Sequence, residues 1–232
     1  MSVTVLITGA NRGIGLALVE EYLNQAAIVF AGCRHISPEL SDLGRRFASM
    51  HIVRMDVKDE PSIIQAAADM ARLTDHLDIV INNAAVGGGS DATLESLDIG
   101  DMLKVLDINV AGPMRVTRAM LAVLKAAKHP RVVNVSSGLG IISTRTSCDS
   151  LSYGTSKAAL NYVTRSLAFD LHRHNIIVVA MSPGWVRTDM GGPSAPLLPH
   201  QSAAGIVKVT AALRTEDSGQ WFNHDGTRHE KW

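Results

Sequence analysis

Short apolar runs alternate along this chain with longer segments in which apolar and polar residues recur at helical spacing. Six runs are apolar at most positions, which is typical of parallel strands buried on both faces. They are residues 3–7, 28–31, 51–55, 77–81, 131–135 and 176–181. The helix-length segments between them are 14–25, 62–74, 102–128 and 156–174. Repeated strand–helix units predict an α/β fold, a single doubly wound Rossmann-type domain over residues 1–232 with a central parallel sheet flanked by helices.

A glycine-rich turn joins the first predicted strand to the first predicted helix. Gly9, Gly13 and Gly15 stand in a G-x-x-x-G-x-G spacing. A strand that turns sharply into a helix whose amino end faces a pyrophosphate leaves no room there for side chains. Such glycines also occur in ordinary tight turns, but their place in the fold favours a dinucleotide site.

The second predicted strand ends at Cys33 and Arg34, where NAD-binding proteins usually carry an acidic residue for the ribose hydroxyls. Here the acid is absent. Arg34 and Arg12 could converge on a ribose phosphate, although either alone would be read as an ordinary surface charge. Together they favour NADP(H) as the cofactor. Asp56 follows the third strand and could either bind the adenine amino group or cap a helix or turn.

A candidate proton donor lies further along the chain. Tyr153 and Lys157 are four residues apart and therefore share a helix face. An ammonium beside a phenol favours the phenolate, so we expect Lys157 to lower the pKa of Tyr153. Ser137 leaves the fifth strand and could hold a substrate oxygen near Tyr153. A dinucleotide and an acid are what hydride transfer to a carbonyl requires.

Other site chemistries fit less well. No G-x-S-x-G elbow surrounds Ser136 or Ser137, which disfavours a nucleophilic serine. The nine histidines lack metal-site spacing, since His172 and His174 are two apart on a helix and point to different faces. No metal site is predicted.

In their order and spacing these motifs resemble the short-chain dehydrogenase/reductase family over essentially the whole chain. Two stretches, residues 183–192 and 219–226, resemble the small C-factor and sniffer carbonyl reductase branch. The wider family resemblance rests on residues 8–15, 56–57, 82–85, 109–110, 133–137, 153–157 and 183–188.

The resemblance implies roles for individual residues. It makes Ser137, the second serine of its motif, the substrate-binding one and gives Ser136 a structural role. It adds a ribose contact to Lys157 and places Asn109 in a water-mediated proton relay. The predicted catalytic residues are Asn109, Ser137, Tyr153 and Lys157. The predicted cofactor-binding residues are Gly9, Asn11, Arg12, Gly13, Ile14, Gly15, Cys33, Arg34, Asp56, Val57, Asn83, Ala84, Ala85, Tyr153, Lys157, Pro183, Gly184, Trp185, Val186 and Thr188.

Three features depart from the family pattern or leave its details open. Ala85 replaces a common glycine, an extra methyl that need not abolish cofactor binding. The segment after Met190 is brief and rich in Gly and Pro, without the helical lid of many relatives, which favours an open substrate pocket. Trp185 either walls that pocket or packs under its own loop.

Composition narrows the partners. Lys plus Arg and Asp plus Glu number 22 each, so no net positive charge favours binding to nucleic acid or anionic lipid. No uncharged apolar run reaches the length of a membrane helix of about 18 residues, so no membrane partner is expected. Two cysteines, Cys33 and Cys148, form no disulfide framework, and the chain enters a strand without a leader, which together favour the cytoplasm. The segments 102–128 and 156–174 could pair between subunits, and we expect a homodimer or homotetramer.

The sequence therefore predicts NADPH-dependent reduction of a small aldehyde or ketone, or the reverse oxidation of an alcohol. The alternative is a dinucleotide-binding signalling or scaffold protein that retains the fold. The intact set of predicted catalytic residues favours catalysis, because a pure binding protein needs no acid beside the nicotinamide.

Overall fold

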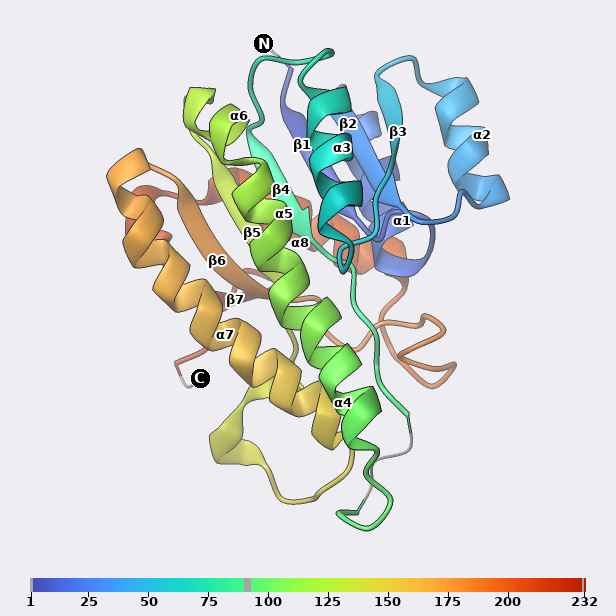
Figure 1. Cartoon of the computed structure of the whole chain (residues 1–232), viewed down its shortest axis with the longest axis vertical. Coiled ribbons are helices and arrows are strands. Elements are labelled where there is room, and N and C mark those ends of the chain that lie inside the picture. Colours follow the sequence, from blue (N-terminus) through green and yellow to red (C-terminus); the bar gives the residue numbers. More distant parts are fainter. Residues whose placement is uncertain (1, 90–92, 231) are drawn as a thin grey trace.

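The strands form one parallel sheet with β1 near its centre (Figure 1). The computed structural model describes residues 2–89, 93–230 and 232. Within this part of the chain the strand order is β3-β2-β1-β4-β5-β6-β7, and neighbouring strands are parallel. The strands are β1 (Thr4–Thr8), β2 (Ile28–Cys33), β3 (Met50–Arg54), β4 (Ile79–Asn82), β5 (Arg131–Val135), β6 (Ile177–Ser182) and β7 (Trp221–Asn223).

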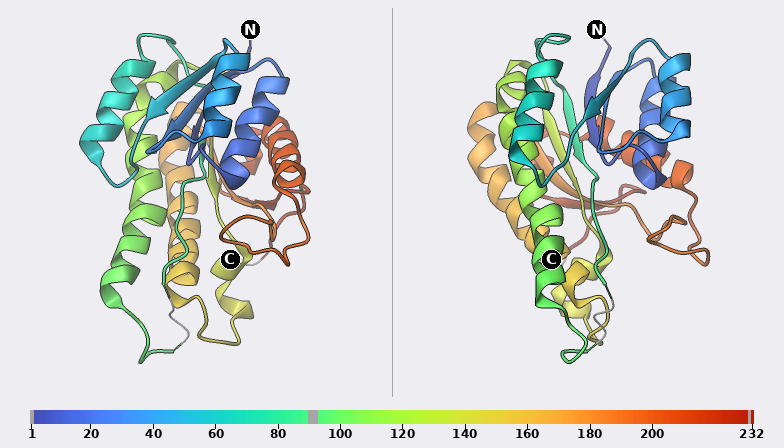
Figure 2. Two further views of the ribbon diagram at one scale, coloured as in Figure 1. Left: turned by 90° about the vertical axis from the view of Figure 1, so that its right-hand side faces the viewer. Right: turned by 45° about the vertical axis from the view of Figure 1, so that its right-hand side comes forward.

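Helices cover both faces of the sheet (Figure 2). One core packs the sheet against α1, α2 and α8, and the other packs it against α3, α5, α6 and α7. The helices are α1 (Gly13–Asn24), α2 (Pro38–Arg46), α3 (Glu60–Met70), α4 (Ile99–Leu106), α5 (Gly112–Ala119), α6 (Leu121–Ala126), α7 (Leu151–Leu171) and α8 (Pro199–Ala212). None of the helices in the described ranges is both long enough and apolar enough to cross a membrane.

The predicted doubly wound fold is confirmed, with differences in particular elements. The segment 102–128, predicted as one helix, is divided into α4, a π-helical turn (Asp107–Ala111), α5 and α6. The helix predicted from residue 156 begins five residues earlier, at Leu151, so α7 includes Tyr153. Strand β7 and helices α2 and α8 were not predicted.

Parallel pairing brings the strand ends that matter to one edge of the sheet. β1, β4, β5 and β6 end at Thr8, Asn82, Val135 and Ser182, and the segments that follow them meet beyond that edge. α4 and the first turns of α7 extend past the same edge (Figure 1). This is where doubly wound sheets bind their ligands.

Candidate active site

The glycine turn after β1 is clamped to the turn after β4. The Thr8 hydroxyl accepts hydrogen bonds from the backbone N–H groups of Asn83 and Ala84, at 3.1 and 3.0 Å. The Asn83 amide donates back to the carbonyl oxygens of Thr8 (2.9 Å) and Gly9 (3.3 Å). A Cβ at Gly15 would lie 2.1 Å from the Gly9 carbonyl oxygen. The turn therefore closes only with glycine at position 15, and backbone lies open to a ligand at the start of α1.

A cleft of about 670 Å³ runs from this turn to the start of α7. It is formed at the carboxyl ends of the strands. It also contains residues that sequence reasoning did not select: Thr8, Gly32, His35, Met55, Val86, Ile108, Val135, Ser136, Arg187, Asp189, Met190 and Pro199. The predicted residues that line it are Gly9, Asn11, Arg12, Gly13, Ile14, Gly15, Cys33, Arg34, Asp56, Val57, Asn83, Ala84, Ala85, Tyr153, Lys157, Pro183 and Thr188.

Five predicted site residues do not line this cleft. They are Asn109, Ser137, Gly184, Trp185 and Val186. Trp185 is 58% exposed, and its indole N–H donates to the Gly191 carbonyl oxygen at 2.8 Å. Trp185 therefore bonds to its own loop, and its predicted place in the wall of the substrate pocket stays a prediction.

The loop after β6 is irregular, as its glycine and proline content predicted. Val186 and Leu197 form a short β-bridge across it, and residues 183–198, all of them described, contain no helix between β6 and α8. A Cβ added to Gly87 would lie 3.8 Å from the Met190 side chain. Met190 therefore reaches across to the loop that follows β4, and the two loops border one opening.

The two arginines predicted to recognise a ribose phosphate each face an aspartate. Arg12 pairs with Asp189 at 2.6 Å, and Arg34 lies 3.9 Å from an Asp56 oxygen. The other Asp56 oxygen accepts the backbone N–H of Lys58, so the predicted turn role of Asp56 is present. All four side chains line the cleft, which places both guanidinium groups where an anionic ligand could replace a carboxylate.

Lys157 and Tyr153 share one face of α7. The Lys157 ammonium is buried, donates to the Val135 carbonyl oxygen at 2.7 Å and lies 5.4 Å from the centre of the Tyr153 ring. Burial lowers the pKa of Lys157 to about 7. Burial raises the pKa of Tyr153, and a hydrogen bond with the Ser137 side chain only partly offsets this rise.

The pKa of Tyr153 is therefore raised on balance, and not lowered as predicted. Burial of the phenol outweighs any stabilisation of the phenolate, and burial of the amine favours its neutral form. Tyr153 is consequently held as a neutral phenol, the form that can donate a proton.

Asn109 lies in the π-helical turn between α4 and α5. Its side-chain oxygen accepts the Val86 N–H at 2.9 Å, and its amide donates to the Val86 carbonyl oxygen (2.9 Å) and the Ser156 hydroxyl (3.0 Å). The Ser156 hydroxyl donates in turn to the Tyr153 carbonyl oxygen at 2.7 Å. Asn109 thus ties the loop after β4 to the start of α7. Its role in a proton relay stays a prediction.

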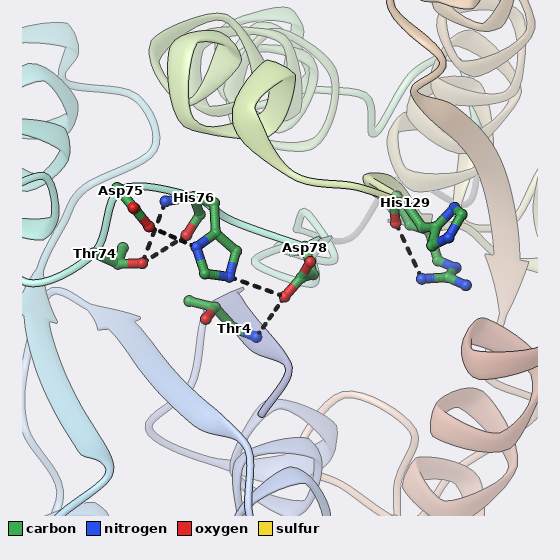
Figure 3. A network of polar contacts seen from close by, with 7 residues as sticks. Thr4, Thr74, Asp75, His76, Asp78 and His129 are labelled. Atoms are coloured by element: carbon green, nitrogen blue, oxygen red, sulfur yellow. Dashed lines mark hydrogen bonds and ion pairs between the residues drawn. The ribbon is translucent and has the colours of Figure 1, made fainter. Parts of the chain in front are cut away.

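His76 forms a polar network with neighbouring aspartates at the opposite edge of the sheet (Figure 3). His76 Nδ1 lies 2.7 Å from Asp75, and its Nε2 lies 3.7 Å from an Asp78 oxygen that accepts the Thr4 N–H. These residues surround the amino ends of β1 and β4, away from the cleft. Across the described ranges, no group of three or more His, Cys, Asp or Glu side chains could hold a metal ion. The two cysteines are free.

Comparison with known proteins identifies relatives over two thirds or more of this chain. C-signal of Myxococcus xanthus is 42% identical over 154 residues, which cover 66% of this chain and 92% of that protein. An uncharacterized oxidoreductase of Schizosaccharomyces pombe is 31% identical over 246 residues, covering 97% of this chain and 96% of the relative.

Solved structures resemble the whole chain. The carbonyl reductase Sniffer of D. melanogaster superposes with a TM-score of 0.94 at 34% identity and covers 98% of this chain and 99% of its own. The NADPH-bound carbonyl reductase from chicken fatty liver gives a TM-score of 0.90 at 33% identity and covers 99% of both chains. The predicted resemblance to the C-factor and sniffer branch is confirmed. A family model described as short chain dehydrogenase matches residues 3–196, and this chain belongs to that family of nicotinamide-dependent oxidoreductases.

Proposed function

We propose that this protein is an NADP(H)-dependent reductase of small aldehydes or ketones, and that it also oxidises the corresponding alcohols. The observation that carries the proposal is the place of Tyr153. A neutral phenol, hydrogen-bonded to Ser137, lies in the same cleft as the glycine turn and two arginines. The cleft thus combines an anion-binding end with a proton donor.

The residues present fit a bound NADP(H). The turn around Gly9 and Gly15 offers backbone where an added Cβ would clash, as a pyrophosphate requires. Arg12 and Arg34 line the cleft where β2 carries no acid, and they would hold the ribose phosphate. The chicken-liver carbonyl reductase was solved with NADPH, which supports the same choice here. When bound, the reduced nicotinamide supplies the hydride.

The side chains supply the proton. Ser137 and Tyr153 would hold the substrate oxygen between their hydroxyl groups, and the Tyr153 phenol would donate its proton as the carbonyl carbon gains a hydride. The raised pKa of Tyr153 keeps the phenol in its acidic form at neutral and mildly alkaline pH, and this is the form from which reduction takes its proton. Lys157, with a pKa of about 7, can take up or release a proton at Nζ near neutrality.

We also propose a homodimer or homotetramer in the cytoplasm. Apolar side chains are exposed on the outer sides of α4 and α7, including Ile99, Leu103, Tyr162 and Phe169. Burying them between subunits would remove this apolar area from water. Light scattering would test the assembly, and a monomer at micromolar concentration would contradict it.

The test of function begins with NADPH oxidation against a panel of aldehydes and ketones. Tyr153→Phe should keep NADPH affinity and lower kcat by about 100-fold to 10,000-fold, the usual contribution of a general acid. Tyr162→Phe is the matched control, because Tyr162 lies on the same helix but is 77% exposed. If Tyr153→Phe transferred hydride within a few-fold of wild type, another proton donor would be required.

The alternative is a dinucleotide-binding signalling or scaffold protein, which the likeness to C-signal supports. The same panel separates the two. NADPH binding without turnover of any carbonyl would favour the binding protein, whereas turnover that depends on Tyr153 favours the reductase.

A further inference from the structure

The face of α7 that packs against the sheet is polar. Tyr153, Lys157, Asn161 and Thr164 follow one another at intervals of four, four and three residues, so they lie on one side of the helix. Lys157 and Asn161 are each 2% exposed, and Thr164 is 0% exposed. A buried face of this kind requires a hydrogen-bond partner for each group.

The partners come from consecutive residues of β5 and its exit. The Ser136 hydroxyl donates to the Asn161 side-chain oxygen at 2.5 Å, and Ser136 itself is 1% exposed. The other contacts lie on either side of this bond. They pair Asn134 with Thr164 at 2.9 Å, the Val135 carbonyl oxygen with Lys157 at 2.7 Å, and the side chain of Ser137 with Tyr153.

The Ser136–Asn161 hydrogen bond is not explained by a contribution to the stability of the folded protein. The Asn161 amide nitrogen is buried and has no hydrogen-bond partner in the described part of the chain. An unpaired buried donor carries a desolvation cost, whereas an apolar pair of similar shape carries none and can be as stable or more stable. The polar pair therefore retains a desolvation cost, which alanine at position 136 and leucine at position 161 would remove.

We propose that Ser136 and Asn161 are positioning residues, whose hydrogen bond fixes α7 along its axis and about it so that Tyr153 and Lys157 meet Ser137. Apolar contacts tolerate small slides of a helix over a sheet, but a short hydrogen bond is directional. Asn161 lies one turn from Lys157, and a misplacement of about 1 Å at a reacting group can cost about 100-fold in rate. The inference rests on the proposed reductase activity.

The test is the double variant Ser136→Ala/Asn161→Leu, with Ser166→Ala as the control. Ser166 lies on α7 as well, but it is exposed and bonds only the Tyr162 carbonyl oxygen. We expect the double variant to unfold at a urea concentration no lower than wild type and to bind NADPH within about two-fold. Its single-turnover hydride transfer should fall by about 10-fold to 100-fold, with kcat rather than KM affected.

A second readout does not need turnover. The titration of Lys157, followed by NMR of the labelled lysine side chains in the free protein, should move to higher pH in the double variant as Nζ leaves the Val135 carbonyl and meets water. If the double variant does not fold, Ser136→Ala alone is measured in the same way. A wild type that reduces no carbonyl would refute the proposed function, and the Lys157 titration would still decide the positioning role. The positioning role would be overturned by an unchanged Lys157 titration or an unchanged rate of hydride transfer. A rate of hydride transfer that falls only in proportion to a loss of stability would also overturn it.

Discussion

Burial of Lys157 makes the stability of this fold depend on pH in a direction that can be worked out. The pKa of Lys157 falls from 10.5 in the unfolded chain to about 7 in the folded protein. Between these values the unfolded chain binds a proton that the folded protein does not, so stability rises with pH by about 1.4 kcal/mol per unit. Below about pH 7 the cost of burying the charge is fully present. From about pH 6 to pH 9 the gain is about 3 kcal/mol.

Lys157→Met isolates this effect, because it keeps a long side chain and removes the titrating amine. Urea unfolding of both proteins at several pH values from about 6 to 9 gives the difference in free energy of unfolding, wild type minus variant. The difference should become more positive by about 3 kcal/mol between about pH 6 and pH 9. Loss of the bond to Val135 adds an offset without a slope, and groups such as Cys33 and Tyr153 titrate in both proteins. A difference that stays constant within about 0.5 kcal/mol would show that Lys157 keeps an ordinary pKa.

Three further outcomes are expected. Arg34→Ala should weaken NADPH binding by about 1.5 to 3 kcal/mol, the value of a charge-assisted hydrogen bond, and leave NADH affinity nearly unchanged. Equal losses of affinity for both cofactors in fluorescence titration would count against a phosphate contact. Asp189→Asn should free Arg12 and strengthen NADPH binding by up to about 1 kcal/mol at low salt, with no gain in NADH binding. Weaker NADPH binding would mean that the ion pair of Arg12 and Asp189 closes over the cofactor instead. Gly15→Ala should abolish detectable cofactor binding and lower the melting temperature, because the new Cβ meets the Gly9 oxygen at 2.1 Å. Gly138→Ala is the control, since its new Cβ would have nothing within 4 Å, and it should change neither property. Normal NADPH affinity in Gly15→Ala would contradict the geometry of the turn.

The sheet was predictable because strands buried on both faces appear in the sequence as apolar runs. Strand β7 was not, since Trp221–Asn223 is only three residues long and gives no periodic pattern. Helix α2 did carry a signal that was overlooked. Ser37 accepts the Leu40 N–H and Pro38 occupies the first turn, a common start of a helix.

The site was predictable where local sequence determines position, as in the glycine turn and the pair on α7. Contacts between distant segments were not. Arg12 and Asp189 are 177 residues apart and Ser136 and Asn161 are 25 apart, and no pattern in either segment indicates its partner. The predicted direction of the Tyr153 pKa shift was wrong for a related reason. Spacing along the sequence shows that a lysine is near, but not how deeply the phenol is buried.

The position of β1 between β2 and β4 has a consequence for how the protein folds. β1 pairs with β2 through a short connection. Its pairing with β4 joins residues 74 apart, and the clamp between Thr8 and Asn83 joins residues 75 apart in the chain. Contacts of such long sequence separation form slowly. The glycine turn needs β4 in place, so we expect it to be completed only when β4 docks. A ligand that recognises the finished turn should leave the refolding rate unchanged and slow unfolding, so its stabilising effect would appear as a longer lifetime of the native state.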